Sequence, residues 1–309
     1  MRPNQPREDL PMYGLAVMFV VIFLFAVIDV AAKWMLVMGI PVMQVVFVRY
    51  AGHFFASAAA FVPKEGRDAF RSNRPGLQFL RSCFLLGGTV MNFTALQYLP
   101  IIVTTAIYFA LPVTISILSY LFLNETIGLK KTLAILVGFG GVLIIVSPWS
   151  AEFHWAIFFS LASLASSSGY FVMTRLLAGV ESNSTSQLWA SGVAMLAMAP
   201  FGLPVWVWPS DLATWIALLI LGPTGAAAHG LAVMAHRYAD ASSLAPVTYV
   251  QAIWATLAGW YLFDNLPGWN TVIGTAILIA SGIYMWWRER ELARERQHLV
   301  AQMQGQAAE

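Results

Sequence analysis

Residues 99–125 read LPIIVTTAIYFALPVTISILSYLFLNE, and residues 238–264 read YADASSLAPVTYVQAIWATLAGWYLFD. At an offset of 139 positions Glu125 falls on Asp264, so both stretches end an apolar run on an acidic residue. Each stretch is long enough to cross the roughly 30 Å hydrocarbon core of a bilayer as a helix. We therefore interpret the two stretches as corresponding helices of two repeated halves.

The composition is that of a membrane protein. Hydrophobic residues make up 59% of the 309 residues and charged residues 10%, against roughly 45–50% and about 25% in soluble domains. A soluble fold of this size could not hide so much apolar surface, which excludes a cytosolic enzyme, a nucleic-acid-binding protein and a secreted disulfide scaffold. The single cysteine, Cys83, excludes an internal disulfide and a Cys-based metal site.

Ten apolar stretches of spanning length divide the chain, and the short connections between them predict antiparallel neighbours. Each half holds five spans, so the second half enters from the opposite side of the membrane. The sequence thus predicts an all-α membrane protein of two inverted repeats, 12–147 and 154–287, with tails at 1–11 and 288–309. The predicted spans are 12–36, 41–63, 76–97, 100–123, 128–147, 154–177, 185–208, 211–235, 241–263 and 269–287.

The distribution of Lys and Arg sets the orientation. Of the 17 such residues, Lys33, Arg49 and Arg81 lie inside spans. The other 14 lie in connections and tails, or within a few residues of span ends, that are cytoplasmic if both termini are inside. Because cytoplasmic loops carry the excess of Lys and Arg in membrane proteins, we expect an N-in, C-in topology with cytoplasmic tails.

Ionisable residues within spans are the first candidates for a functional site. Asp29 and Lys33 stand four residues apart and share a helix face, so they can pair. Arg49 lies at a similar depth on the next span. Three roles stay open for this group: a structural latch, direct contact with a ligand, or a conformational switch. Arg81, near the cytoplasmic end of the third span, is expected to snorkel toward the membrane surface.

The histidines indicate neither a metal nor a cofactor. His53 lies one helical turn after Arg49 and is either a protonation site or a neutral imidazole bonded to a neighbouring helix. His229 and His236 can share a face of the eighth span, but no third ligand accompanies them at metal spacing. We therefore expect no metal site and no cofactor.

The fourth and ninth spans offer the best candidates for a cavity. Polar, hydroxyl and aromatic side chains recur there at helical spacing, which suits a midplane pocket for a planar or amphipathic solute. Ordinary helix packing is the alternative. The residues are Thr104, Tyr108, Pro112 and Ile115, with Ser243, Val247, Gln251 and Trp254 at the corresponding positions.

Two further expectations concern helix geometry. Pro112 removes a backbone hydrogen bond and frees a carbonyl for a hinge or a ligand. Gln251 stands at the corresponding position, so the ninth span is expected to stay unkinked. A stripe of small and polar residues on the sixth span is explained by close helix contact; it consists of Ser160, Ser163, Ser167 and Tyr170.

The order of these features resembles the drug/metabolite transporter superfamily with paired EamA domains. Within it, the chain looks most similar to bacterial uptake carriers for S-adenosylmethionine and riboflavin, although it has Asp264 where Glu is more usual. The segments that carry the resemblance are DVAAKW (29–34), FVRY (47–50), FLRS (79–82), ALQYLP (95–100), LPV (111–113), RYADASSLAPVTY (237–249) and GWYLFDNLP (259–267). The resemblance implies ten spans in two EamA repeats around a central site. The substrate-binding candidates are Asp29, Lys33, Arg49, His53, Tyr108, Tyr249, Gln251 and Trp254, and the gating candidates are Pro112 and Pro246.

The expected function is secondary transport of a small organic metabolite across the cytoplasmic (inner) membrane of a prokaryote. A vitamin or nucleoside-like solute ranks first, and amino-acid or drug export second. An intramembrane enzyme or a non-transporting scaffold is the competing class, but no nucleophile elbow, zinc-protease motif or phosphate-binding loop is found. The expected partners are a small-molecule substrate and the lipid bilayer, without nucleic acid; a homodimer stays open.

Overall fold

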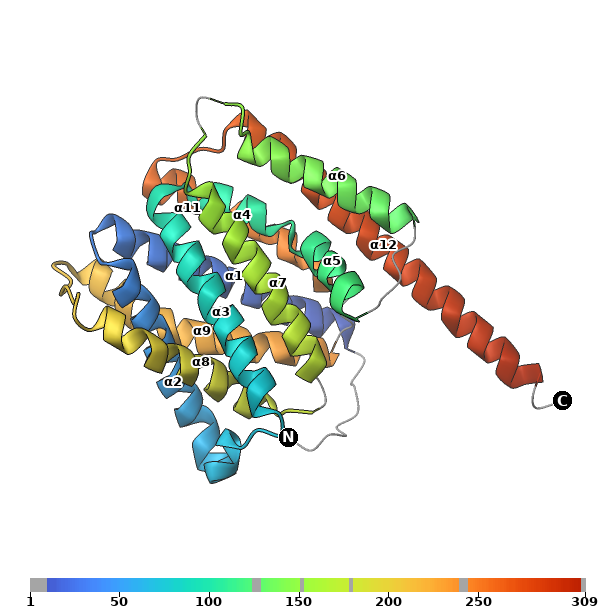
Figure 1. The fold of residues 1–309 in the computed structure, drawn as a ribbon, viewed down its shortest axis with the longest axis horizontal. Coiled ribbons are helices and arrows are strands. Elements are labelled where there is room, and N and C mark those ends of the chain that lie inside the picture. Colours follow the sequence, from blue (N-terminus) through green and yellow to red (C-terminus); the bar gives the residue numbers. More distant parts are fainter. Residues whose placement is uncertain (1–9, 124–128, 151–152, 178–179, 239–243, 307–309) are drawn as a thin grey trace.

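The computed structural model describes residues 10–123, 129–150, 153–177, 180–238 and 244–306, and within these ranges the chain is helical without a strand (Figure 1). The first half comprises α1 (Pro11–Val37), α2 (Val42–Glu65), the 3-10 helix η1 (Gly66–Phe70), α3 (Pro75–Tyr98), α4 (Ile101–Tyr108), α5 (Leu111–Leu123) and α6 (Leu129–Val146). The second comprises α7 (Ile157–Leu177), α8 (Asn183–Gly202), α9 (Leu212–Tyr238), the 3-10 helix η2 (Ala245–Val250), α11 (Gln251–Phe263) and α12 (Trp269–Gln306).

Each of the ten predicted spans coincides with helical structure, which confirms the all-α membrane fold. Seven helical segments in the described ranges are long and apolar enough to cross a membrane, one of them running through α4 into α5. The seventh span was predicted to reach residue 208, but α8 ends at Gly202. The apolar residues that follow form a connection instead, in which Gln44 bonds both the N–H and the carbonyl of Val207, each at 2.8 Å.

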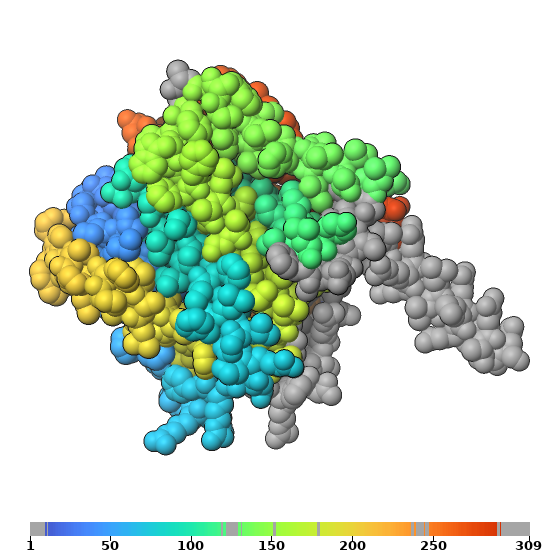
Figure 2. All heavy atoms as spheres, viewed as in Figure 1, coloured from blue at the N-terminus to red at the C-terminus, as the bar shows by residue number. Residues whose placement is uncertain are grey.

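The two halves pack against each other reciprocally. The first helix of the first half, α1, packs along α9, the third of the second half; α3 packs in the same way along α7. Three spans meet their own counterparts: α2 packs on α8, α6 packs on α12, and the fourth span meets the ninth through α4 and α11. Figure 1 shows the last pair side by side, and Figure 2 shows α3 and α7 as adjoining surfaces. A two-fold inverted relation between five-helix halves produces this exchange of partners.

The fourth span is interrupted near its middle. α4 ends at Tyr108, and α5 begins at Leu111. Between them, the N–H groups of Phe109 and Ala110 bond to carbonyls three residues back, at 3.2 and 3.1 Å. Because Pro112 has no N–H, the Tyr108 carbonyl lacks the helical partner that a residue at this position would supply.

The ninth span changes conformation at the corresponding place. Here η2 ends at Val250 and α11 begins at Gln251, the residue that aligns with Pro112 at the offset of 139. The 3-10 helix continues directly into α11, so the span changes its winding here without a break, and the prediction that it stays unkinked is not contradicted. Pro246, which lies within η2, also lacks an N–H and has a fixed φ, and the segment around it winds as a tighter 3-10 helix. The change of winding in the ninth span thus falls at a position equivalent to the interruption of the fourth.

Small residues bring helices of the two halves into close contact. A Cβ atom added to Gly222 on α9 would lie 2.4 Å from the Cα atom of Gly52 on α2. One added to Gly141 on α6 would lie 2.9 Å from the carbonyl oxygen of Gly274 on α12. On α7, Ser163 donates a hydrogen bond to the carbonyl of Gly88 on α3 at 2.7 Å. The expected close helix contact along the α7 stripe is confirmed at Ser163.

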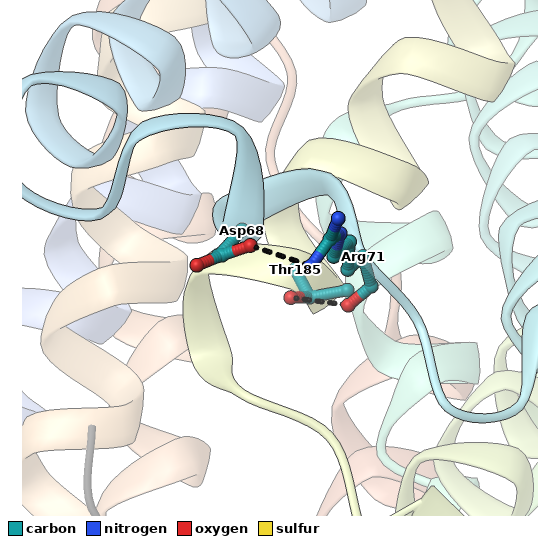
Figure 3. Close-up of polar contacts among 3 residues, drawn as sticks. All are labelled: Asp68, Arg71 and Thr185. Atoms are coloured by element: carbon teal, nitrogen blue, oxygen red, sulfur yellow. Dashed lines mark hydrogen bonds and ion pairs between the residues drawn. The ribbon is translucent and has the colours of Figure 1, made fainter.

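The connection between α2 and α3 is held against the start of α8. Arg71 forms an ion pair with Asp68 at 3.2 Å, and the hydroxyl of Thr185 donates to the Arg71 carbonyl at 3.3 Å (Figure 3). Ser184 donates to a carboxylate oxygen of Glu65 at 2.5 Å. Since the Arg71–Asp68 pair is exposed, it adds little stability; the contacts to α8 fix the connection in place.

Candidate functional site

Asp29 connects three helices at the junction of the two halves. One carboxylate oxygen accepts a hydrogen bond from the Asn92 side chain of α3 at 3.3 Å, and the other accepts from the Gln251 side chain of α11 at 3.2 Å. Asp29 itself lies on α1 and stays partly exposed. Both partners are N–H donors, the arrangement that an ionised carboxylate requires.

Lys33 ties α1 to the end of α3. Its ammonium group donates to the carbonyl of Leu96 at 2.5 Å and to that of Leu99 at 3.0 Å, and the residue is 7% exposed. The last carbonyls of a helix lack internal donors and carry the negative end of the helix dipole. Among the residues described, no ion pair joins Lys33 to Asp29, so the two side chains do not pair as predicted. Backbone carbonyls take the place of the carboxylate.

Arg49 is enclosed among aromatic rings. Its guanidinium carbon lies 5.2 Å from the ring centre of Phe93 and 5.7 Å from that of Tyr50, within cation–π range. The residue is 8% exposed, and its buried Nε atom has no hydrogen-bond partner. Its guanidinium forms neither a hydrogen bond nor an ion pair with any residue that the structure describes. Arg49 nevertheless lies within electrostatic range of Asp29.

Two tyrosine hydroxyls lie within electrostatic range of the same guanidinium. The hydroxyl of Tyr108, at the end of α4, is hydrogen-bonded to Ser163, at 3.2 Å, and to Ser167. That of Tyr50 is hydrogen-bonded to Thr89 at 2.6 Å and donates to the Leu85 carbonyl. The interior around Arg49 therefore combines aromatic rings with hydroxyl groups.

His53 and His229 form a separate buried pair. The rings stack with centres 5.5 Å apart and an angle of 21° between their planes. His53 is 2% exposed and forms a 3.3 Å hydrogen bond with the side-chain oxygen of Gln187 on α8. This contact matches the imidazole bonded to a neighbouring helix that the sequence left open. The side chain of His236 lies outside the described residues.

Arg81 does not snorkel as predicted. The residue is 6% exposed, and its guanidinium donates to the Thr174 hydroxyl at 2.7 Å, the Ser186 carbonyl at 3.1 Å and the Tyr170 hydroxyl at 2.8 Å. The prediction is wrong because α7 and α8 enclose the side chain and supply acceptors inside the bundle. Arg81 thus joins three helices.

The remaining candidates contact other parts of the bundle. The ring of Tyr249 packs against Phe109, directly after α4, with ring centres 5.3 Å apart. Trp254 packs edge-on against Phe23 and Phe19 of α1, at 5.2 and 6.2 Å. The structure therefore brings together Asp29 and Gln251, with Arg49 and Tyr108 in electrostatic range of Asp29. It places Tyr249 and Trp254 in helix contacts. Ser243 lies outside the described residues.

Sequence reasoning missed Asn92 and Gln187. Both are uncharged amides, and each bonds a residue that the sequence did single out. An amide within an apolar span was the available signal, since buried polar side chains need partners.

A cavity of about 560 Å³ opens one helical turn from Asp29, between the end of α1 and the end of α11. It lies at the side of the bundle that the Lys and Arg distribution makes external. Its lining residues are Lys33, Val37, Trp260, Tyr261, Leu262, Phe263, Asp264 and Asn265.

Two reciprocally packed halves with charged side chains enclosed at their junction are typical of membrane transporters built from inverted repeats. The chain belongs to the EamA-like transporter family, which matches residues 12–147 and 154–287. The resemblance that the sequence motifs indicated is thereby confirmed.

Curated relatives match most of the chain. It is 25% identical to a protein of Rickettsia prowazekii (strain Madrid E) named S-adenosylmethionine uptake transporter, over 80% of this chain and 84% of that one. It is 27% identical to one of Vibrio cholerae serotype O1 named riboflavin transporter, over 93% and 97%. A protein of known crystal structure matches with a TM-score of 0.62 at 18% identity, covering 91% of this chain and 99% of its own. This last likeness concerns the fold alone.

Proposed function

We propose that the protein is a secondary carrier that moves a vitamin or nucleoside-like solute, of the riboflavin or S-adenosylmethionine type, by alternating access. The proposal rests on one observation above all: the Asp29–Gln251 hydrogen bond joins the two halves near Arg49, which has no hydrogen-bonding partner among the residues that the structure describes. In transporters built from inverted repeats, the ligand site lies at the repeat interface. Asp29, Arg49, Gln251 and Tyr108 are the substrate-contacting residues in this proposal.

Residues 12–147 and 154–287 are the two halves that rock about this centre, with 1–11 and 288–309 as cytoplasmic tails. The interruption before Pro112 in the fourth span and the change from 3-10 to α winding after Pro246 in the ninth lie at matching positions. They are the proposed hinges, because a few residues at element ends absorb such motions. We assign packing roles to Lys33, His53, Tyr249 and Trp254, whose contacts hold neighbouring helices around the site.

Uptake into proteoliposomes tests the function. The purified full-length protein is reconstituted, and uptake of radiolabelled riboflavin and S-adenosylmethionine is followed beside empty liposomes. We expect uptake of one of them, reduced by about tenfold or more in Asp29→Asn, which corresponds to a loss of at least about 1.4 kcal/mol of interaction.

Asp68→Asn is the matched control. Asp68 is an exposed carboxylate on η1, with 75% of its side chain accessible, so its substitution should leave uptake within about twofold, the scale of a neutral surface change. No uptake of either solute by the folded wild-type protein would contradict the proposed substrate range. An equal loss in both variants would contradict the proposed role of Asp29.

A further inference from the structure

Among the described residues, two charged groups at the junction of the two halves lack a full set of hydrogen-bond partners: the carboxylate of Asp29 and the guanidinium of Arg49. Lys33 gives its hydrogen bonds to the Leu96 and Leu99 carbonyls, and Arg81 gives its own to Thr174, Ser186 and Tyr170. Both cations are therefore solvated by protein groups.

Asp29 keeps unused capacity to accept hydrogen bonds. Each carboxylate oxygen receives one bond from a neutral amide, at 3.3 and 3.2 Å, whereas an ionised carboxylate offers about four acceptor positions. No Lys or Arg nitrogen among the described residues lies within ion-pair distance of it. A cationic group would be the complementary ligand at this point.

Arg49 has the opposite requirement. A guanidinium carries five N–H donors, and none of them has an acceptor among the described residues. Its aromatic neighbours Phe93 and Tyr50 stabilise the cation through their faces but supply no acceptor in the guanidinium plane. Burying an unpaired charge is costly. An anion that accepts two parallel hydrogen bonds from the Arg49 guanidinium would therefore gain the most binding free energy at this point.

The two charges are also separated. Asp29 and Arg49 interact electrostatically but lie beyond the 4 Å limit of an ion pair. A neutral solute would leave both charges unpaired, and an anion would leave the carboxylate unpaired and repelled. A solute with an ammonium group and a carboxylate pairs both and keeps the site neutral.

We infer that the site selects a zwitterion, a solute with an amino-acid end whose ammonium group binds Asp29 and whose carboxylate binds Arg49. This inference rests on the proposed function and favours the S-adenosylmethionine type of solute over the riboflavin type. The rings and hydroxyls of Tyr50 and Tyr108 then lie near the remainder of the solute.

Calorimetric binding to the full-length protein in lipid nanodiscs tests the inference with four probes. These are S-adenosylhomocysteine, its N-acetyl derivative, its carboxamide and riboflavin. The N-acetyl derivative lacks the ammonium group, and the carboxamide lacks the carboxylate. We expect each loss to weaken binding by at least about tenfold, the scale of losing one partner of a charge-assisted bond, and riboflavin to bind more weakly than the parent compound.

The variants assign each preference to one side chain. In Arg49→Gln the carboxamide should bind as tightly as the parent, while the N-acetyl derivative stays weak; in Asp29→Asn the pattern should reverse. A purely structural role would lower all affinities together and leave the ratios unchanged. Asp68→Asn and Arg71→Gln, in the exposed pair of Figure 3, are the matched controls and should keep the wild-type ratios.

Arg49→Lys is the second variant if Arg49→Gln fails to elute as a monodisperse peak. It keeps the charge and should retain a preference for the carboxylate. Equal binding of the parent, the N-acetyl derivative and the carboxamide to the wild type would overturn the inference. Tighter binding of riboflavin would also overturn it while leaving the carrier function intact. No binding of any probe, together with no uptake of either solute, would overturn both proposals.

Discussion

The guanidinium of Arg81 donates a hydrogen bond to the hydroxyl of Tyr170 at 2.8 Å, and its carbon atom lies 4.6 Å from the centre of the same ring. One side chain thus makes an edge contact and a face contact with one aromatic residue. With the bonds to Thr174 and Ser186, this relationship joins α3 to α7 and α8 inside the bundle.

Loss of this side chain should destabilise the fold. Arg81→Ala removes three charge-assisted hydrogen bonds and leaves buried acceptors unpaired, so we expect a loss of about 2–4 kcal/mol, built from typical values for such bonds. Thermal unfolding of the detergent-solubilised protein measures the effect. The control is Arg67→Ala, at an exposed position of η1, which should leave the midpoint nearly unchanged. Equal midpoints for the two variants would mean that Arg81 reaches solvent after all.

Pro112→Ala should slow transport more than it weakens binding. The substitution restores an N–H that can bond to the Tyr108 carbonyl, so it favours a continuous fourth span over the interrupted one. We expect an uptake rate lower by about threefold or more, the effect of shifting a conformational barrier by about 0.7 kcal/mol or more. Affinity should stay near wild type. Pro75→Ala is the control, because Pro75 starts α3, where proline interrupts nothing. Unchanged rates in Pro112→Ala would remove the hinge role.

Neighbouring glycines on α6 should respond differently to the same change. In Gly141→Ala the new Cβ would lie 2.9 Å from the Gly274 carbonyl oxygen, whereas nothing lies within 4 Å of a Cβ at Gly140. We expect Gly141→Ala to cost about 1–3 kcal/mol by overpacking the contact with α12. Gly140→Ala should be neutral or stabilising by up to about 1 kcal/mol through helix propensity. Chemical denaturation in mixed micelles compares the two, and equal stabilities would contradict the close α6–α12 contact.

The contribution of Asp211 to stability should depend on pH. The hydroxyl and the N–H of Thr214 donate to its carboxylate at 2.7 and 2.9 Å, and these bonds hold the pKa of Asp211 below its ordinary value of 3.8. A lowered folded-state pKa gives stability that is present above the unfolded value and is lost as the pH falls through the folded one. The difference in melting midpoint between wild type and Asp211→Ala should therefore be constant near neutral pH and shrink below about pH 4. A difference in midpoint that is as large at pH 3 as near neutral pH would contradict the stabilisation of the ionised Asp211 carboxylate by Thr214.

The positions of the membrane-spanning segments could be predicted from the sequence because each crossing requires a long apolar run. The sequence did not locate the end of α8, since the residues after Gly202 are as apolar as the helix and stop being helical where Gln44 binds the Val207 backbone. The 3-10 winding at the start of the ninth span was also not predictable. Pro246 was noted in its motif, but a single proline does not reveal how many residues around it wind as a 3-10 helix.

Part of the candidate site could be predicted from residue type alone. Asp29 and Arg49 stand out because charged side chains in apolar spans are rare. Their partners were not accessible: Lys33 binds backbone carbonyls, which every residue carries, and Asn92 reaches Asp29 only after α1 and α3 have packed. Arg81 was misplaced because its depth was estimated along one helix, whereas its acceptors come from two others.

The length of α12 bears on how the protein can be observed at work. The helix continues from the bundle to Gln306 and projects away from it (Figure 1); at about 1.5 Å per residue, the part after Arg288 extends roughly 27 Å. A fluorescent label or an antibody epitope attached at Gln306 would be held at that distance from the helix bundle. Transport could then be recorded without the reporter touching the machinery it reports on.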